Sequence, residues 1–145
     1  MIRISVLKKS SANALDELGS LYAELHDARK LQKSVIRKNV IELLRNPDAR
    51  LLVATDRNRI VGMAMLFAMQ KIGSKSASVE DVIVSSLYRG HGIGEKLMKA
   101  LEKQARKMRV TSIGLTSRPS RVAANKLYMK LGYKRRDTNA YKKEL

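Results

Sequence analysis

A glycine-rich turn in this chain has the residue types and the spacing that bind phosphate. Gly90, Gly92 and Gly94 lie between an apolar segment that ends near Val84 and a long amphipathic segment that follows them. Glycine lets the backbone come close to a ligand, and the N–H groups at the start of a helix attract phosphate oxygens with the help of the helix dipole. The turn therefore predicts an anion site made of main-chain amides. A tight strand-to-helix connection without a ligand is the structural alternative.

Two common phosphate-binding motifs do not fit this turn. A Rossmann fingerprint requires a glycine three residues after its second glycine, and Glu95 stands there instead. A P-loop that began at Gly90 would require glycine at position 95 as well, followed by Lys and then Ser or Thr, but Glu95 is followed by Lys96 and Leu97. The turn therefore belongs to neither class of nucleotide site.

A third pattern does fit, and a second motif downstream supports it. The pattern is Arg or Gln, two residues, Gly, one residue, and Gly or Ala, and it is met by Arg89, Gly92 and Gly94. The downstream motif is Ala, two residues, an apolar residue, Tyr, three residues, Gly and an aromatic residue. It is filled in order by Ala124, Leu127, Tyr128, Gly132 and Tyr133. Through these two motifs the chain resembles the GNAT acetyltransferase superfamily, over roughly residues 50–136.

The resemblance implies a co-substrate, acetyl-coenzyme A, and no metal. Main-chain N–H groups of the loop would hold its pyrophosphate, and the strand before the loop would hydrogen-bond the pantetheine arm, which behaves as an added strand. Asn125 is a further candidate for hydrogen bonding to pantetheine. The expected cofactor-binding residues are Val82, Ile83, Val84, Arg89, Gly90, His91, Gly92, Ile93, Gly94, Glu95 and Asn125.

The resemblance also implies an N-acetyltransferase that acts on a primary amine, either of a small molecule or of a peptide or protein. In family members a Tyr at the place of Tyr128 donates a proton to the leaving thiolate, and a phenol with a pKa near 10 is suited to this. The chain has no Cys, so an acetyl-cysteine intermediate is excluded and direct attack in a ternary complex is expected. Packing of the Tyr128 ring in the core is the structural alternative.

Glu80 is the candidate general base, directly or through water. A lysine-like amine has a pKa of about 10.4, so its deprotonation at neutral pH costs roughly 4 kcal/mol, which a nearby carboxylate helps to offset. Because side chains alternate along a strand, only one of Glu80 and Asp81 is expected to face the reacting groups. The structural alternative is that both carboxylates pair with nearby cations.

Four other polar residues have roles that the sequence leaves open. The Arg89 side chain either holds a phosphate or only fixes the loop, and His91 is expected to be a loop residue rather than a base. His26 is expected to be structural. Arg121 departs from the family pattern, in which many members have Asn seven residues before the Tyr, although Arg is also able to bind a phosphate.

The apolar periodicity predicts the elements that position these residues. Strands are expected at about residues 2–7, 50–54, 60–72, 77–84 and 110–116, with a terminal hairpin at 133–136 and 140–143. Helices are expected from the caps Ser10 and Ser11 to Leu25, at 34–45, from the glycine turn to about 109, and from about 120 to Gly132. This is an α/β (α+β) fold. The resemblance implies the GNAT fold, a central mixed, mostly antiparallel twisted sheet of six to seven strands flanked by about four helices.

The composition indicates one globular domain over residues 1–145, with 44% apolar residues. Two His and no Cys leave no histidine cluster, zinc ribbon or disulfide scaffold. The N-terminal residues lack the apolar core of a signal peptide, and no apolar run is long enough to span a bilayer. We therefore expect a cytoplasmic protein that does not enter the membrane.

The net charge of +17 is unusual, since 30 Lys and Arg stand against 13 Asp and Glu. Such a surface attracts polyanions through counterion release. The alternative function is therefore a basic nucleic-acid or ribosome-associated binding module that keeps the GNAT fold without turnover. A third hypothesis keeps coenzyme A but uses another acyl donor or an O-linked acceptor. Homodimers are common in the family, so a homodimer is an expectation by resemblance.

Overall fold

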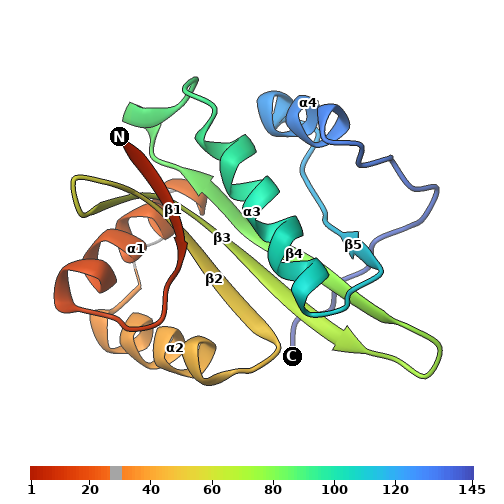
Figure 1. Ribbon diagram of the computed structural model, residues 1–145, viewed down its shortest axis with the longest axis horizontal. Helices are drawn as coiled ribbons and strands as arrows, with labels where there is room; N and C mark the ends of the chain where they lie inside the picture. Colours follow the sequence, from red (N-terminus) through yellow and green to blue (C-terminus); the bar gives the residue numbers. More distant parts are fainter. Residues whose placement is uncertain (27–30) are drawn as a thin grey trace. The chain divides into compact units, whose positions relative to one another are not determined.

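The computed structural model describes residues 1–26 and 31–145, which divide into two compact units, Met1–Leu115 and Thr116–Leu145. The first unit runs β1 (Ile2–Val6), α1 (Ala12–Leu25), α2 (Lys33–Arg45), β2 (Ala49–Asp56), β3 (Arg59–Gln70), β4 (Lys75–Val84), a short 3₁₀ turn (Ser86–Tyr88), α3 (Ile93–Lys107) and β5 (Ser112–Gly114). The second unit contains α4 (Val122–Lys130). Figure 1 labels the helices α1–α4 and the strands β1–β5. None of the helices formed by the described residues is both long and apolar enough to cross a membrane.

The sheet has five strands in the order β1-β2-β3-β4-β5. The first three pairings are antiparallel and the pairing of β4 with β5 is parallel, so the expected mixed, mostly antiparallel sheet is confirmed. The expected count of six to seven strands is wrong, because the sheet of the described residues has five. The terminal hairpin predicted at 133–136 and 140–143 is wrong, because residues 133–145 form no strand. Lys134, Arg135 and Arg136 follow one another here, and Thr138 is the one β-branched residue of the segment. A run of like charges with so few β-branched residues favours neither strand pairing nor a buried apolar face.

Local signals in the sequence explain where several elements begin and turn. Ser11 caps α1, since its Oγ accepts the N–H of Ala14 at 3.2 Å. The two residues between β2 and β3, Arg57 and Asn58, both have positive φ (45° and 69°), which is the conformation of a tight type I′ hairpin turn. This turn joins the two strands that the sequence predicts at 50–54 and 60–72.

Helices cover both faces of the sheet. On one face α1 and α2 pack their buried Leu18, Leu21 and Val40 against strand residues that include Met63 and Ile83. On the other face α3 packs against β2 and β3, and its Leu97, Met98 and Leu101 are fully buried. The fold thus joins β4 to the start of α3 through the short 3₁₀ turn and the glycine turn, at the point where the sequence predicts the anion site.

One glycine allows α3 to approach the sheet. A Cβ at Gly62 would lie 3.1 Å from the carbonyl oxygen of Ile83 and 3.3 Å from Cδ1 of Leu97. The first contact is with backbone, which has little room to move. We expect Gly62→Val to destabilise the fold by about 1–3 kcal/mol through overpacking, measured by urea denaturation. The matched control is Gly73→Val, where an added Cβ meets nothing within 4 Å; an equal loss in both variants would contradict this packing argument.

A β-bulge interrupts β4 near its end. Met63 pairs with Ile83 and Met65 pairs with Glu80, so Asp81 and Val82 together lie opposite a single residue of β3. Asp81 has φ of 47°, in the left-handed region. Cross-strand partners share a face of the sheet, so Glu80 and Ile83 lie on the same face, the one covered by α1 and α2. The strict alternation used to separate Glu80 from Asp81 therefore does not hold at this position.

Candidate active site

The glycine turn has the conformation that only glycine adopts easily. Gly90 and Gly92 have φ of 79° and 73°, and a Cβ at either would meet nothing within 4 Å, so backbone conformation rather than space requires glycine here. Gly92 is the N-cap of α3, and the first bond within the helix runs from the Lys96 N–H to the Gly92 carbonyl at 3.1 Å. The N–H groups of Ile93, Gly94 and Glu95 precede that bond, as at every helix start.

The Arg89 side chain is held by protein groups. Its Nε donates to the carbonyl of Val84 at 3.0 Å, and its Nη2 lies 3.5 Å from Oε2 of Glu24 on α1. The same Glu24 oxygen accepts the N–H of Ser86 at 2.9 Å. These contacts tie the loop to the end of β4 and to α1. Of the two roles left open by the sequence, they favour fixing of the loop.

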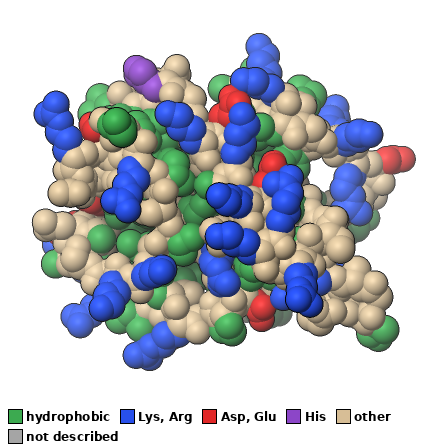
Figure 2. Space-filling model, in the orientation of Figure 1, with side chains coloured by type: hydrophobic (Ala, Val, Ile, Leu, Met, Phe, Trp, Pro, Cys, Tyr) green, Lys and Arg blue, Asp and Glu red, His purple; other side chains and the backbone are tan. Residues whose placement is uncertain are grey.

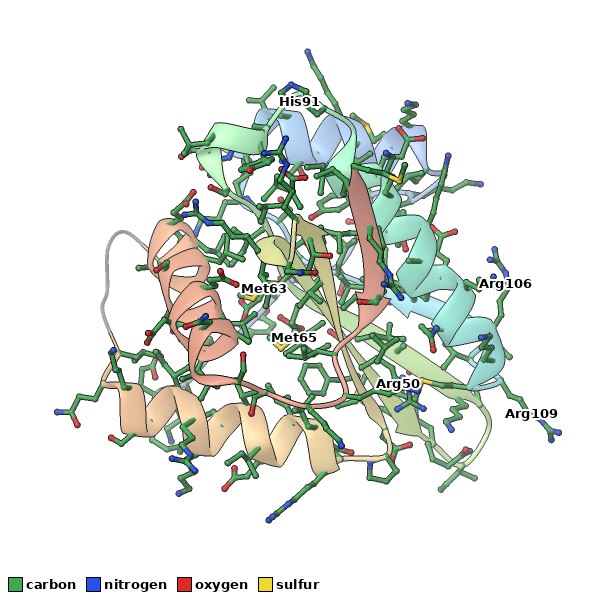
Figure 3. The ribbon with its side chains drawn as sticks, turned by 60° about the vertical axis from the view of Figure 1, so that its left-hand side comes forward. Arg50, Met63, Met65, His91, Arg106 and Arg109 are labelled. Atoms are coloured by element: carbon green, nitrogen blue, oxygen red, sulfur yellow. The ribbon has the colours of Figure 1, made fainter. Side chains whose placement is uncertain are left out.

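His91 and Tyr88 complete the loop. His91 is exposed at the tip (Figure 3), and its Nδ1 lies 3.3 Å from the carbonyl oxygen of Tyr88. The Tyr88 hydroxyl donates to Oδ2 of Asp56 at 3.2 Å. The histidine therefore contacts the loop backbone, in line with its expected place as a loop residue.

The strands β4 and β5 pair over a short stretch only. The parallel ladder joins residues 76–78 to residues 112–114, and β4 continues to Val84 along β3. Val82, Ile83 and Val84 form this last part of β4, with Ile83 buried and the other two partly exposed. The residues expected to contact pantetheine thus lie between the end of the β4–β5 ladder and the glycine turn.

The two carboxylates of β4 have different partners. The Ser78 hydroxyl donates to Oε1 of the exposed Glu80 at 2.5 Å. Asp81 Oδ1 lies 3.4 Å from Nε2 of His26, and the His26 ring stacks on Tyr22 with centroids 4.1 Å apart. Figure 3 shows Met63 and Met65 on the face of the sheet that α1 covers, to which the register also assigns Glu80.

Sequence reasoning missed the pair formed by His26 and Asp81. His26 caps the C-terminal end of α1, and Asp81 lies 55 residues further along the chain, in the bulge. No spacing rule connects two such positions, and the positive φ of Asp81 leaves no mark in the sequence. The Tyr22–His26 spacing of four residues on a helix is the one local signal, since such residues are neighbours on the helix surface.

The second unit holds Tyr128 and Asn125, both on α4. Tyr128 is buried, with 6% of its surface exposed, and burial raises the pKa of its phenol while the charge and hydrogen bond of Arg121 act in the opposite direction. A raised pKa keeps the phenol protonated at neutral pH, which is the form that a general acid needs. Asn125 Nδ2 donates to the carbonyls of Arg118 and Arg121 at 2.9 and 3.0 Å, so both amide protons serve the start of α4.

The predicted residues therefore fall into two groups. The glycine turn, the end of β4, Glu80 and Asp81 belong to the unit Met1–Leu115, while Tyr128 and Asn125 belong to the unit Thr116–Leu145. Within the described residues, no group of three or more His, Asp or Glu side chains is arranged to hold a metal ion.

Comparison of the chain with models of known protein families decides its family. The model of the family described as "Acetyltransferase (GNAT) family" matches residues 15–133. The chain belongs to the GNAT acetyltransferase family. The match includes both sequence motifs, the glycine turn and the α4 motif around Tyr128.

Solved structures agree with this GNAT assignment at the level of the fold. A putative acetyltransferase from Agrobacterium tumefaciens has a TM-score of 0.86 and 18% identity, with 98% of this chain and 99% of that chain covered. A transcriptional regulator from Bacillus halodurans has a TM-score of 0.86 and 23% identity over 99% and 100% of the two chains. The aminoglycoside N-acetyltransferase AAC(6')-Iy, solved in complex with CoA, has a TM-score of 0.83 and 15% identity over 99% and 95%.

Proposed function

We propose that this GNAT protein transfers an acetyl group from acetyl-coenzyme A to a primary amine by direct attack within a ternary complex. The observation that carries the proposal is the turn in which Gly90 and Gly92 adopt positive φ at the start of α3, in the connection that follows β4. Family membership and the CoA complex of a structural neighbour support the choice of acetyl donor.

Main-chain groups would hold the donor. The amides from Arg89 to Glu95 would bind the pyrophosphate, because the start of α3 offers N–H groups and the positive end of a helix dipole. The Val82–Val84 backbone would hydrogen-bond the pantetheine arm beyond the point where the β4–β5 ladder ends. The bonds of Arg89 to Glu24 and Val84 would keep the loop in the binding conformation before the donor arrives.

Two proton transfers accompany the acetyl transfer. The amine nitrogen forms a bond to the thioester carbonyl carbon, and the carbon–sulfur bond breaks. Tyr128 donates its phenolic proton to the departing sulfur, and Glu80 accepts the proton that the amine loses, directly or through water. Each proton transfer of this kind contributes typically about 10²- to 10⁴-fold to the rate.

The His26–Asp81 pair is a second candidate for the base. If Nε2 of His26 donates to Asp81, its Nδ1 is the acceptor nitrogen of a neutral imidazole, and the carboxylate stabilises the cation formed when a proton arrives. The left-handed φ of Asp81 is a backbone strain of the sort that persists at functional sites.

Two variants distinguish these bases. If Glu80 is the base, Glu80→Gln should lower kcat/KM at neutral pH by about 10²-fold or more, while Asp81→Asn has a smaller effect. The loss should shrink as the pH rises toward the amine pKa of about 10.4, because the free amine then forms without help. The measurement is thiol release from acetyl-coenzyme A with a panel of amines over a range of pH. The reverse order of effects would assign the base to the His26–Asp81 pair.

The proposal as a whole is tested by the same thiol-release assay on the unaltered protein, together with calorimetry of acetyl-coenzyme A binding. Binding and turnover are expected with at least one primary amine. Binding of acetyl-coenzyme A without turnover on any amine would favour the alternative of a GNAT-fold binding module. Absence of coenzyme binding would contradict the proposed anion site at the start of α3.

A further inference from the structure

The outward side of α3 carries a row of cations, which we call the α3 basic face. Its members are all exposed and are Lys96, Lys99, Lys103, Arg106, Lys107 and, in the turn that follows the helix, Arg109. From the first to the last the row spans about 20 Å at 1.5 Å per residue. Figure 2 shows Lys and Arg gathered over the region that α3 occupies in Figure 1, and Figure 3 shows Arg106 and Arg109 pointing away from the sheet.

Carboxylates neutralise only part of this face. Lys99 Nζ pairs with Glu95 Oε1 at 2.8 Å, and Arg106 Nη2 lies 3.7 Å from Glu102 Oε2, both one helical turn apart. Among the described residues, no carboxylate pairs with the remaining four cations, which are Lys96, Lys103, Lys107 and Arg109. Six cations against two carboxylates give the face a net charge of +4.

The stability of α3 itself does not explain the row of cations. Cations in the last turn, Arg106 and Lys107, complement the negative end of the helix dipole. Lys96 lies near the positive end, where the dipole disfavours a cation, and Lys103 lies between the ends. The apolar side of α3 packs without them, since Leu97 and Leu101 are buried against the sheet. The uncompensated charge is therefore available to an anionic partner.

The residue types of the α3 basic face indicate which kind of polyanion it would bind. Proteins that bind single strands stack bases on aromatic side chains, and α3 contains no aromatic residue. Lys and Arg without aromatics suit the phosphates of a duplex, whose bases remain stacked inside. At about 3.4 Å of axis per phosphate, 20 Å spans about six phosphates of one strand.

We propose that the α3 basic face binds the phosphate backbone of a nucleic-acid duplex without reading its sequence. This inference does not depend on acetyl transfer. The far end of the face is the part that tests it, because Lys103 lies about 15 Å along the helix from Ile93 and so is remote from the glycine turn.

The experiment compares two triple variants with equal loss of charge. The test variant is Lys103→Gln, Lys107→Gln and Arg109→Gln. The control is Arg37→Gln, Lys38→Gln and Arg45→Gln, three exposed positions on α2, which packs on the other face of the sheet. Gln keeps a helix propensity close to that of Lys and Arg, and circular dichroism checks that both variants remain folded.

Binding is measured by fluorescence anisotropy with DNA and RNA duplexes of about 20 base pairs and with the corresponding single strands, at roughly 50–200 mM salt. For a duplex that binds, the plot of log K against log salt should become less steep by about 2.7 in the test variant, because three phosphate contacts are lost. The duplex Kd at the lowest salt should rise roughly tenfold or more. The control variant should retain the original slope within about one unit.

Several outcomes would overturn the proposal. Equal effects of the two triple variants would mean that net charge alone drives binding. Tighter binding of single strands than of either duplex would contradict the chosen partner, and so would polyglutamate competing as well as duplex at equal charge. Absence of duplex binding at the lowest salt would show that the α3 basic face does not bind nucleic acid. Preference for RNA or for DNA among the duplexes supports the proposal in either case and identifies the form bound.

Discussion

Tyr128→Phe is expected to lower kcat by about 10²- to 10⁴-fold and to leave the Kd of acetyl-coenzyme A nearly unchanged. The substitution removes one hydroxyl, and with it the proton that the departing sulfur would receive. The ring remains, so its packing in the second unit, including the edge contact with Tyr133 at 6.1 Å, is preserved. The measurement is steady-state thiol release together with calorimetric binding.

The pH profile gives this expectation a second readout. Burial raises the pKa of the Tyr128 phenol, so this phenol should stay protonated throughout the neutral and moderately alkaline range. A fall in kcat that depends on this group should therefore begin only above the ordinary phenol pKa of about 10. The control is Tyr141→Phe, since Tyr141 is 90% exposed and lies outside every regular element. Unchanged turnover in Tyr128→Phe would contradict the proposal that Tyr128 is the general acid.

Gly92→Val is expected to weaken acetyl-coenzyme A binding by roughly tenfold or more. Gly92 has φ of 73°, and a residue with a side chain is destabilised by about 1–2 kcal/mol in this left-handed conformation. A free-energy difference of about 1.4 kcal/mol changes a Kd tenfold. A β-branched residue is a stronger outlier still. If the loop relaxes in the free variant, binding must restore the strained conformation, and the cost appears in the Kd. Calorimetry measures the change directly.

Gly73→Val is the matched control for the loop substitution. Gly73 lies in the turn between β3 and β4, has no left-handed φ and leaves open space for a side chain, so its coenzyme affinity should not change. A Gly92→Val protein with reduced thermal stability but undiminished affinity would show that the glycine serves folding alone. In that case the amides at the start of α3 would not be the pyrophosphate site.

Much of the fold was predictable because its signals are local. Ser11 caps α1 as expected, the polar turn at Arg57 and Asn58 joins β2 to β3, and α3 follows the glycine turn. Each of these depends on residues within a few positions of one another, where capping and turn preferences act. The terminal hairpin does not form, because the charged residues of this segment leave no apolar face for a strand pair to bury.

The finer features of the candidate site depend on contacts between distant residues. Arg89 meets Glu24 across 65 positions, and His26 meets Asp81 across 55. Helix α1 and the end of β4 must both be in place before either contact exists, so no window of sequence contains it. The glycine turn itself was predictable, because three glycines at a fixed spacing mark it in the sequence.

The β-bulge at Asp81 and Val82 adds one residue to β4 and so changes which face of the sheet the side chains before it occupy. If Ile83 kept its place in the core and the strand were regular, Glu80 would fall on the side occupied by α3, among Leu97 and Leu101. A lone carboxylate in such surroundings costs several kcal/mol or becomes protonated. By shifting the phase of the strand, the bulge lets one short segment place an exposed carboxylate at Glu80 and, three residues later, a buried apolar side chain at Ile83.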